Sequence, residues 1–98
     1  MTDLNGDTPL HYSIFNLNNE VAVLLLGAGA NVHARNLQGR TPCHNASEDM
    51  PSLLPELMAI GANVDAPDTD SVTPRHLLKS APPTTEEIEL ARRRVLNV

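Results

Sequence analysis

The chain has 98 residues, enough for one small domain, and carries seven basic against twelve acidic side chains, for a net charge of −5. This balance disfavours binding to the phosphate backbone of nucleic acids. Its single cysteine, Cys43, excludes an internal disulfide framework, and no stretch reads as a signal peptide or a membrane span. We therefore expect an intracellular protein, cytoplasmic or nuclear, with no nucleic-acid or membrane partner.

A four-residue phrase returns three times along the chain at nearly constant spacing. Thr8–His11 is followed after 33 residues by Thr41–His44 and after a further 32 by Thr73–His76. A period of this size marks stacked supersecondary units. Threonine favours the N-cap and proline the first position of a helix, so each phrase is predicted to open a short helix.

In the first unit, a turn is predicted at Asn5-Gly6, and helices are predicted over about residues 9–16 and 19–27. Gly29 then stands where a left-handed residue ends a helix. The second helix carries a predicted core stripe, widened by Leu24. The stripe consists of Val21, Ala22, Leu25 and Leu26.

The second unit repeats this stripe but is one residue shorter, and the loss falls between Asp49 and Met50. A shortened second helix is predicted over about Leu53–Ala59, with Ser52 as its cap and Pro55 in its first turn. The equivalent stripe consists of Leu53, Leu54, Leu57 and Met58.

The third unit departs furthest from the pattern. Ser71 replaces the turn glycine, Arg75 replaces the apolar third residue of the phrase, and Pro82-Pro83 is predicted to end the first helix early. Thr84 and Glu87 form a predicted capping box for a last helix, which serves as a terminal cap or leads into a longer helix. Its predicted apolar stripe consists of Ile88, Ala91, Val95 and Val98.

The pattern Asp-x-x-Gly-x-Thr-Pro-Leu-His, an apolar helix and Gly-Ala-Asn-Val resembles the ankyrin repeat over nearly the whole chain. The resemblance implies an all-α solenoid of stacked helix–turn–helix units with β-turn hairpin loops. One domain is expected over residues 1–98, with repeats at 3–35 and 36–67 and a degenerate capping repeat at 68–98.

Four histidines and one cysteine raise the question of a metal site. His11, His44 and His76 lie one unit apart, roughly 10 Å at the usual distance between packed helices, which is too far for ligands of one ion. The resemblance implies that these histidines bond within their own turn and to the next unit's backbone. Cys43 is expected to be a packed hydrophobe. We expect no metal ion, no cofactor and no catalytic residue.

The resemblance implies a non-catalytic module that binds another protein through its hairpin tips and a concave face of an elongated stack. Phe15 is the expected anchor because it and Tyr12 are the only aromatic residues, although packing against the next unit would also explain it. The contact positions implied by the family are Leu4, Asn5, Asp7, Phe15, Asn16, Arg35, Leu37, Gln38, Arg40, Glu48, Asp49, Thr69, Asp70 and Val72.

Other interpretations stay open. The run of arginines at 92–94 could serve in nuclear targeting or dock anions, but it also suits the C-terminal end of a helix that begins with acidic residues. The chain could be a fragment or regulatory end of a larger, possibly enzymatic protein. It could also self-associate through the uncovered face of the first unit, near Ile14 and Val21. No residues support hydrolase or metalloenzyme activity of this chain alone.

Overall fold

The computed structural model describes residues 4–79 and 81–96, and this part of the chain contains helices and no strand. The elements confirm the predicted all-α class. They are α1 (Pro9–Phe15), α2 (Asn19–Gly27), α3 (Pro42–Asp49), the 3₁₀ turn η1 (Pro51–Leu53), α4 (Leu54–Ala59), α5 (Pro74–Leu77) and α6 (Thr85–Leu96).

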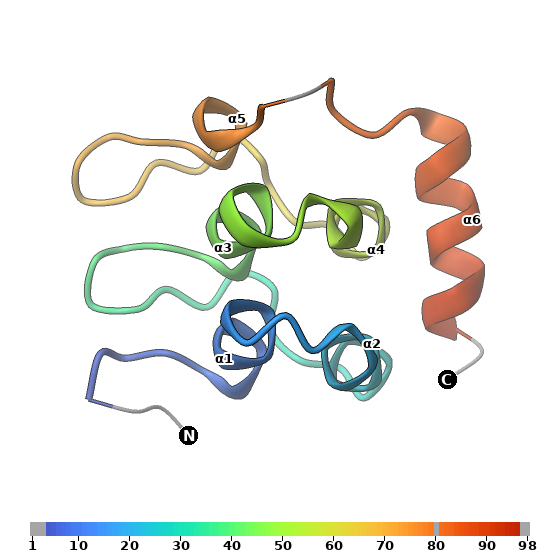
Figure 1. Ribbon diagram of the computed structural model, residues 1–98, viewed down its shortest axis with the longest axis horizontal. Helices are drawn as coiled ribbons and strands as arrows, with labels where there is room; N and C mark the ends of the chain where they lie inside the picture. Colours follow the sequence, from blue (N-terminus) through green and yellow to red (C-terminus); the bar gives the residue numbers. More distant parts are fainter. Residues whose placement is uncertain (1–3, 80, 97–98) are drawn as a thin grey trace.

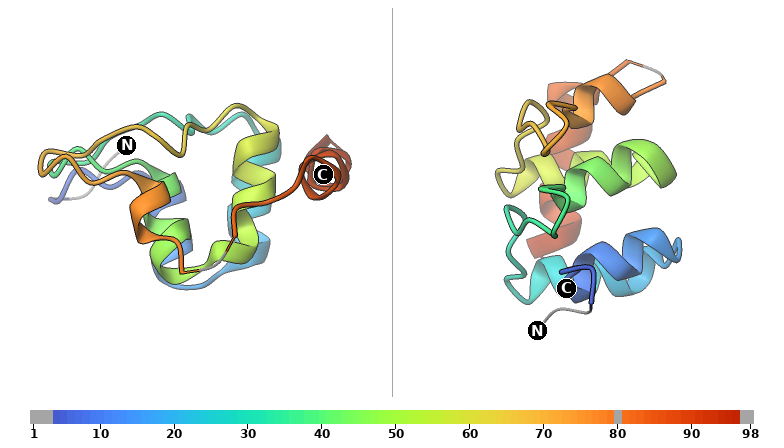
Figure 2. Two further views of the ribbon diagram at one scale, coloured as in Figure 1. Left: turned by 90° about the horizontal axis from the view of Figure 1, so that it is seen from above. Right: turned by 90° about the vertical axis from the view of Figure 1, so that its left-hand side faces the viewer.

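The helices form two columns joined by loops. Helices α1, α3 and α5 stack in one column, and α2 and α4 stack beside the first two of them (Figure 1). The loops before α3 and α5 reach out as hairpins on the side away from α2 and α4 (Figure 2). The extents of 32 × 28 × 20 Å show that the stack is not elongated, contrary to the expectation, because only two units of the described residues contribute a full helix pair.

Helix α6 does not continue the second column. It runs along the outside of α4 and α2, nearly parallel to the stacking direction, and packs mainly on α4 (Figures 1 and 2). Ala91 and Val95, from the predicted stripe, are buried, Ile88 is half-buried, and Val98 lies outside the described residues. The last helix therefore caps the back of the stack and leaves its end open.

The predicted helix starts at Pro9, Pro42 and Pro74 are confirmed. Each proline follows an extended threonine, and the hydroxyl of Thr8 accepts a hydrogen bond from the His11 N–H at 3.4 Å. Helix α2 has the predicted bounds, and α1 ends one residue earlier than predicted.

The connection in the shortened second unit differs from the prediction. In the first unit Leu17 turns the chain between α1 and α2 with a φ of 58°. The second unit lacks this residue, and the extended, buried Met50 leads instead into the 3₁₀ turn, so α4 begins at Leu54. Ser52 is not the cap, because no side chain caps either η1 or α4.

Close packing of the hairpin tips explains two of the turn glycines. A Cβ on Gly6 would stand 2.9 Å from the Leu37 nitrogen, and one on Gly39 would stand 3.0 Å from the Thr69 nitrogen. Ser71 holds the equivalent left-handed position with a φ of 64°. Its side chain is tolerated there because no further tip of the described chain crosses it.

The core lies between the two columns. Its largest fully buried apolar side chains are Leu10, Ile14, Leu53, Leu54 and Leu57. The predicted stripe of α4 is confirmed, except that Met58 is half-buried. In α2 the stripe is interrupted, because Val21 is 40% exposed and Leu25 half-buried where no unit of the described chain lies beneath them.

The third unit confirms the predicted early end and the capping box. Helix α5 has four residues and ends at Leu77, before the proline pair. The Thr84 N–H donates to Glu87 Oε1 at 2.9 Å, and the Glu87 N–H donates to Thr84 Oγ1 at 3.2 Å. Arg75 is exposed and pairs with Asp65 at 2.7 Å.

Candidate functional site

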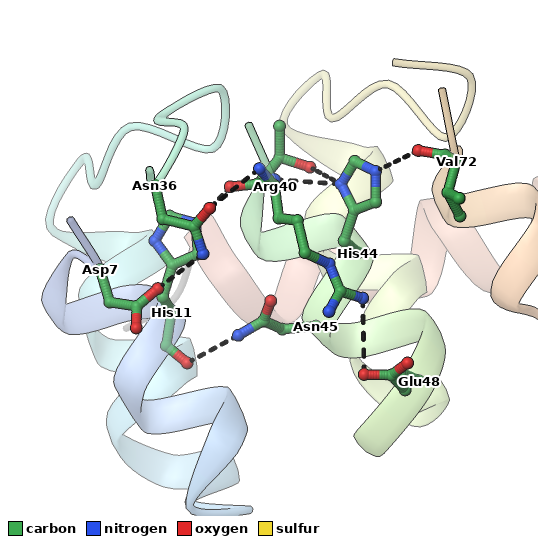
Figure 3. A network of polar contacts seen from close by, with 9 residues as sticks. Asp7, His11, Asn36, Arg40, His44, Asn45, Glu48 and Val72 are labelled. Atoms are coloured by element: carbon green, nitrogen blue, oxygen red, sulfur yellow. Dashed lines mark hydrogen bonds and ion pairs between the residues drawn. The ribbon is translucent and has the colours of Figure 1, made fainter. Parts of the chain in front are cut away.

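The side of the molecule opposite α6 presents the hairpin tips and the first helices (Figure 2). We call this surface the tip face and define it by tips 4–7, 37–40 and 69–72 with the exposed positions of α1 and α3. The Arg40 guanidinium lies 3.4 Å from Glu48 Oε1, which places the end of α3 beside the hairpin (Figure 3). Phe15 occupies in α1 the position of Glu48 in α3, and therefore belongs to the same face.

Two histidines tie consecutive units together, as Figure 3 shows. His11 Nε2 lies 2.9 Å from the Arg40 carbonyl oxygen, and His44 Nε2 lies 2.8 Å from that of Val72. In each case Nδ1 accepts the N–H of the threonine three residues before it. Each ring therefore carries its proton on Nε2 and donates it to the next unit, which confirms the expected bonding of both histidines.

His76 repeats only half of this arrangement. Its Nδ1 accepts the Thr73 N–H at 3.2 Å, but the ring is exposed, because no unit of the described chain follows it.

Amide and carboxylate side chains hold the hairpins in register. Asn36 donates to Asp7 Oδ1 at 2.9 Å, and Asn36 Oδ1 accepts the Arg40 N–H at 3.0 Å (Figure 3). Asp68 takes the place of Asn36 in the third unit and accepts the N–H groups of Asp70 and Val72. The hydrogen bond from the Val72 N–H is the main cause of the lowered pKa of Asp68.

Burial lowers the pKa of His44 below its ordinary value of 6.5, against the opposing effect of its bond to Val72. Nearby Arg40 and Arg35 lower this pKa further, and Asp68 raises it. As pH falls below 6.5, the imidazole of His44 becomes protonated in the unfolded chain. In the folded chain it stays neutral to a lower pH, because its pKa is lowered there. Stability contributed by the neutral ring is thus complete above pH 6.5 and is lost as pH falls through the lowered folded pKa.

We therefore expect the free energy of unfolding in urea to decrease from about pH 7.5 to about pH 5.5. The carboxyl groups of Asp65 and Asp68, whose pKa values are also lowered, add to this decrease only below pH 3.8. In a His44→Ala variant the decrease above pH 5 should be smaller. An equal decrease in the variant would show that another group is responsible.

Cys43 is fully buried, and burial raises the pKa of its thiol to about 12. A thiol in this state is neither a nucleophile nor a ready metal ligand. The expectation of a packed hydrophobe is confirmed. Among the described residues there is no group of three or more His, Cys, Asp or Glu side chains that could hold a metal ion. No helix of the described chain is long and apolar enough to cross a membrane.

Most of the expected contact residues lie exposed on the tip face. Leu4, Leu37 and Phe15 are 97%, 75% and 66% exposed, so packing against the next unit covers a minor part of Phe15. Asp7, Arg40 and Val72 are half-buried. The others are exposed, namely Asn5, Asn16, Arg35, Gln38, Glu48, Asp49, Thr69 and Asp70.

Arg35 differs from the other exposed residues because its guanidinium already holds the loops together. Its Nη1 donates to the carbonyl oxygens of Gly39 at 2.9 Å and Pro67 at 2.6 Å. A partner would have to compete with both bonds. Arg35 is therefore better placed to link two units than to contact a partner.

The sequence interpretation missed an ion pair behind the stack, in which the carboxylate is buried and the guanidinium is exposed. Glu56 of α4 is 3% exposed, and its Oε1 lies 3.1 Å from Arg94 of α6. Arg92 pairs with Glu89 at 3.6 Å. Of the arginine run, Arg94 thus contributes to holding α6 on α4, besides suiting the end of its own helix. The sequence contained a sign of this ion pair, because Glu56 occupies the position that Leu24 holds in the first unit.

Paired helices stacked in register, with hairpins on one side, define the class of helical solenoid repeats. The family model of the ankyrin repeat matches residues 5–37. The crystal structure of the ankyrin repeat domain of Bcl-3, a member of the IkappaB family, matches 99% of this chain and 38% of that chain, at a TM-score of 0.75 and 27% identity. The chain belongs to the ankyrin-repeat family, as the sequence resemblance predicted.

Two curated proteins are similar in sequence to this chain. Protein phosphatase 1 regulatory subunit 27 of Homo sapiens is 34% identical over 87 residues, which cover 88% of this chain and 55% of that protein. Its Mus musculus counterpart is 35% identical over 75 residues, which cover 76% of this chain and 49% of that protein. The chain thus spans about half the length of the curated relatives it matches.

Proposed function

We propose that this chain is a non-catalytic module that binds another protein through the tip face. The observation that carries the proposal is the position of α6, which covers the back of α2 and α4 and leaves the tip face open (Figure 2). Leu4, Phe15 and Leu37 stand exposed on that face. Large apolar side chains within a polar surface are typical of binding anchors.

The chemistry of the described residues supports binding without catalysis. His11 and His44 are occupied by hydrogen bonds between units, and the thiol of Cys43 is buried and protonated. Glu48, Asp49 and Asp70 of the tip face are exposed to solvent.

The charges of the tip face favour a basic partner. The expected contact residues of this face carry four carboxylates against two guanidinium groups. The carboxylates are Asp7, Glu48, Asp49 and Asp70, and the guanidinium groups are Arg35 and Arg40, of which Arg40 pairs with Glu48. Association should then be faster at low ionic strength.

The relatives suggest which partner to test first. Both are named as regulatory subunits of protein phosphatase 1. We infer that this chain serves a regulatory or scaffolding role in a larger assembly, and that the catalytic subunit of protein phosphatase 1 is the first candidate partner.

The experiment measures binding of the purified phosphatase catalytic subunit to the immobilised chain. Phe15→Ala should weaken binding at least about tenfold, because truncation of an aromatic anchor costs more than about 1.4 kcal/mol. The helical circular dichroism of this variant should stay unchanged.

Leu90→Ala is the matched control, since Leu90 is 58% exposed on α6, on the opposite side of the molecule. It should bind as the wild type does. Equal weakening by Leu90→Ala would contradict the assignment of the tip face. Absence of any binding by the wild type would contradict this choice of partner.

A further inference from the structure

A hollow lies behind the stack, where α2, α4 and the C-terminal half of α6 meet, on the side of the molecule away from the tip face (Figures 1 and 2). It has a volume of about 440 Å³. None of the residues that line it belongs to the expected contact positions. They are Asn19, Glu20, Val23 and Leu24 of α2, Glu56 of α4 and Arg94 of α6.

The carboxylate of Glu56 is unusual in this wall because it is buried and only half satisfied. The residue is 3% exposed, and its Oε1 lies 3.1 Å from Arg94 Nη2. Its Oε2 is buried and has no hydrogen-bond partner among the described residues. A carboxylate offers about four acceptor sites, and a buried oxygen that uses none of them lowers stability.

The fold itself does not require a carboxylate at this position. Leu24 holds the equivalent place in the first unit and faces the same hollow. An apolar side chain is thus compatible with the repeat and would avoid the unpaired oxygen of Glu56. The buried Oε2 therefore points to a ligand that supplies the missing hydrogen-bond donor.

The charges of the wall indicate that this donor is a cation. Among the described residues that line the hollow, Glu20 and Glu56 carry carboxylates and Arg94 carries a guanidinium group. One further positive charge would balance them. The Arg94 side chain is 64% exposed, so it has room to move aside while a ligand reaches the carboxylate. Attraction between charges is stronger at such a partly buried site than in open water.

The rest of the wall specifies an organic cation. Leu24 is 56% exposed and Val23 is half-buried, so both offer apolar surface beside the carboxylates. The amide oxygen of Asn19 is a further acceptor. A metal ion prefers a shell of six or more oxygen ligands, and the nearby Arg94 would repel it. An ammonium group on an alkyl chain suits the wall better, because its N–H groups donate while its chain covers apolar surface.

We propose that this hollow binds a primary ammonium group on an alkyl chain. Glu56 Oε2 and the Glu20 carboxylate accept its hydrogen bonds, and Val23 and Leu24 contact the alkyl chain. A free diamine and the lysine side chain of another protein share this chemistry. The site is separate from the tip face, so the inference does not depend on the proposed function.

The test follows the amide NMR signals of the isotope-labelled chain at constant ionic strength. Cadaverine, an alkyl diamine, or Nα-acetyl-lysine amide is added up to about 20 mM. Both probes should shift the signals of residues that line the hollow until the shifts saturate, and tips 37–40 and 69–72 should stay unchanged. A lower dissociation constant for cadaverine would identify a free amine as the source, and a lower one for the lysine derivative would identify a protein side chain.

Three substitutions locate the site. Glu56→Gln keeps the shape of the side chain and removes its charge, and it should raise the dissociation constant of both probes at least about tenfold. Glu20→Gln should raise it about threefold, because the exposed Glu20 is screened by water. Glu89→Gln is the matched control, since it removes a carboxylate of α6 that pairs with Arg92 and does not line the hollow. It should bind as the wild type does.

Circular dichroism of each variant verifies folding. If Glu56→Gln fails to fold, Glu20→Gln decides, since its side chain is exposed. Absence of saturable shifts with both probes would overturn the proposal, as would unchanged binding by a folded Glu56→Gln or equal weakening by Glu89→Gln. Equal shifts from tetramethylammonium would also overturn it, because this ion carries the charge without an N–H donor.

Discussion

Replacing His44 with alanine is expected to lower the free energy of unfolding by about 3 kcal/mol. The ring is fully buried and bridges the second and third units, since it accepts the Thr41 N–H and lies 2.8 Å from the Val72 carbonyl oxygen. Its loss leaves one buried N–H unpaired, removes the link between units and creates a cavity. The total free energy of unfolding of a small domain is about 5–15 kcal/mol, so the loss of this one side chain removes a large share of it.

His33 provides the matched control for this substitution. Its side chain is exposed, and its backbone N–H donates to Asn31 Oδ1 at 2.9 Å within the loop. His33→Ala should change the free energy of unfolding by less than about 0.5 kcal/mol. Urea unfolding of both variants at neutral pH gives the comparison. Similar values for the two variants would show that the bridge between units has little energetic importance.

The second large effect is expected at the ion pair behind the stack. Arg94→Ala should destabilise the protein by about 2 kcal/mol, because it leaves the buried Glu56 carboxylate without its cation. The estimate lies below that for a fully buried pair because the Arg94 side chain is 64% exposed. The amide hydrogens of α6 should exchange faster in this variant, since α6 rests mainly on α4.

Glu56→Leu is the informative counterpart. It installs the residue type that Leu24 provides in the first unit, and it removes a carboxylate whose Oε2 is buried without a hydrogen-bond partner among the described residues. We expect this variant to match or exceed the wild type in stability. Adding Arg94→Ala to it should then have almost no effect. A Glu56→Leu variant less stable than Arg94→Ala would show that the pair itself is a net source of stability.

The sequence allowed prediction of those parts of the fold that depend on local chemistry. Each threonine-proline pair starts a helix, with a side-chain cap from Thr8 and from Thr73, and the Thr84–Glu87 box starts α6. The histidine bridges between units were also correct for His11 and His44 because the repeat fixes both donor and acceptor. A spacing of about one unit places the same positions next to each other throughout the stack.

The features that were missed depend on the path of the chain in three dimensions. A terminal cap was expected, but the covering of the back of the stack by α6 follows from the short α5 and the extended Leu78, which no local pattern predicts. Serine is a residue type that often caps helices, but Ser52 lies inside a 3₁₀ turn. Ile14 was placed near an uncovered face, and it is fully buried between the columns. Only Val21 of that pair is exposed.

For the candidate site, the contact positions implied by the family indicated which side chains would be exposed. They did not indicate which of these side chains form hydrogen bonds within the chain itself. Arg35 illustrates the difference, since its guanidinium spans two loops. Phe15 illustrates the opposite outcome, because nothing in the repeat pattern distinguishes an exposed aromatic residue from a packed one at the end of α1. Whether the expected contact residues bind a partner remains a prediction for experiment.

The most direct test of the central claim is photo-crosslinking from the two opposite sides of the folded chain. A benzophenone amino acid is placed at position 15 on the tip face or at position 90 on α6, and both proteins are irradiated in the presence of the partner. We predict crosslinks to another polypeptide from position 15 and none from position 90. Crosslinks from position 90 alone would show that the partner binds behind the stack and would contradict the account.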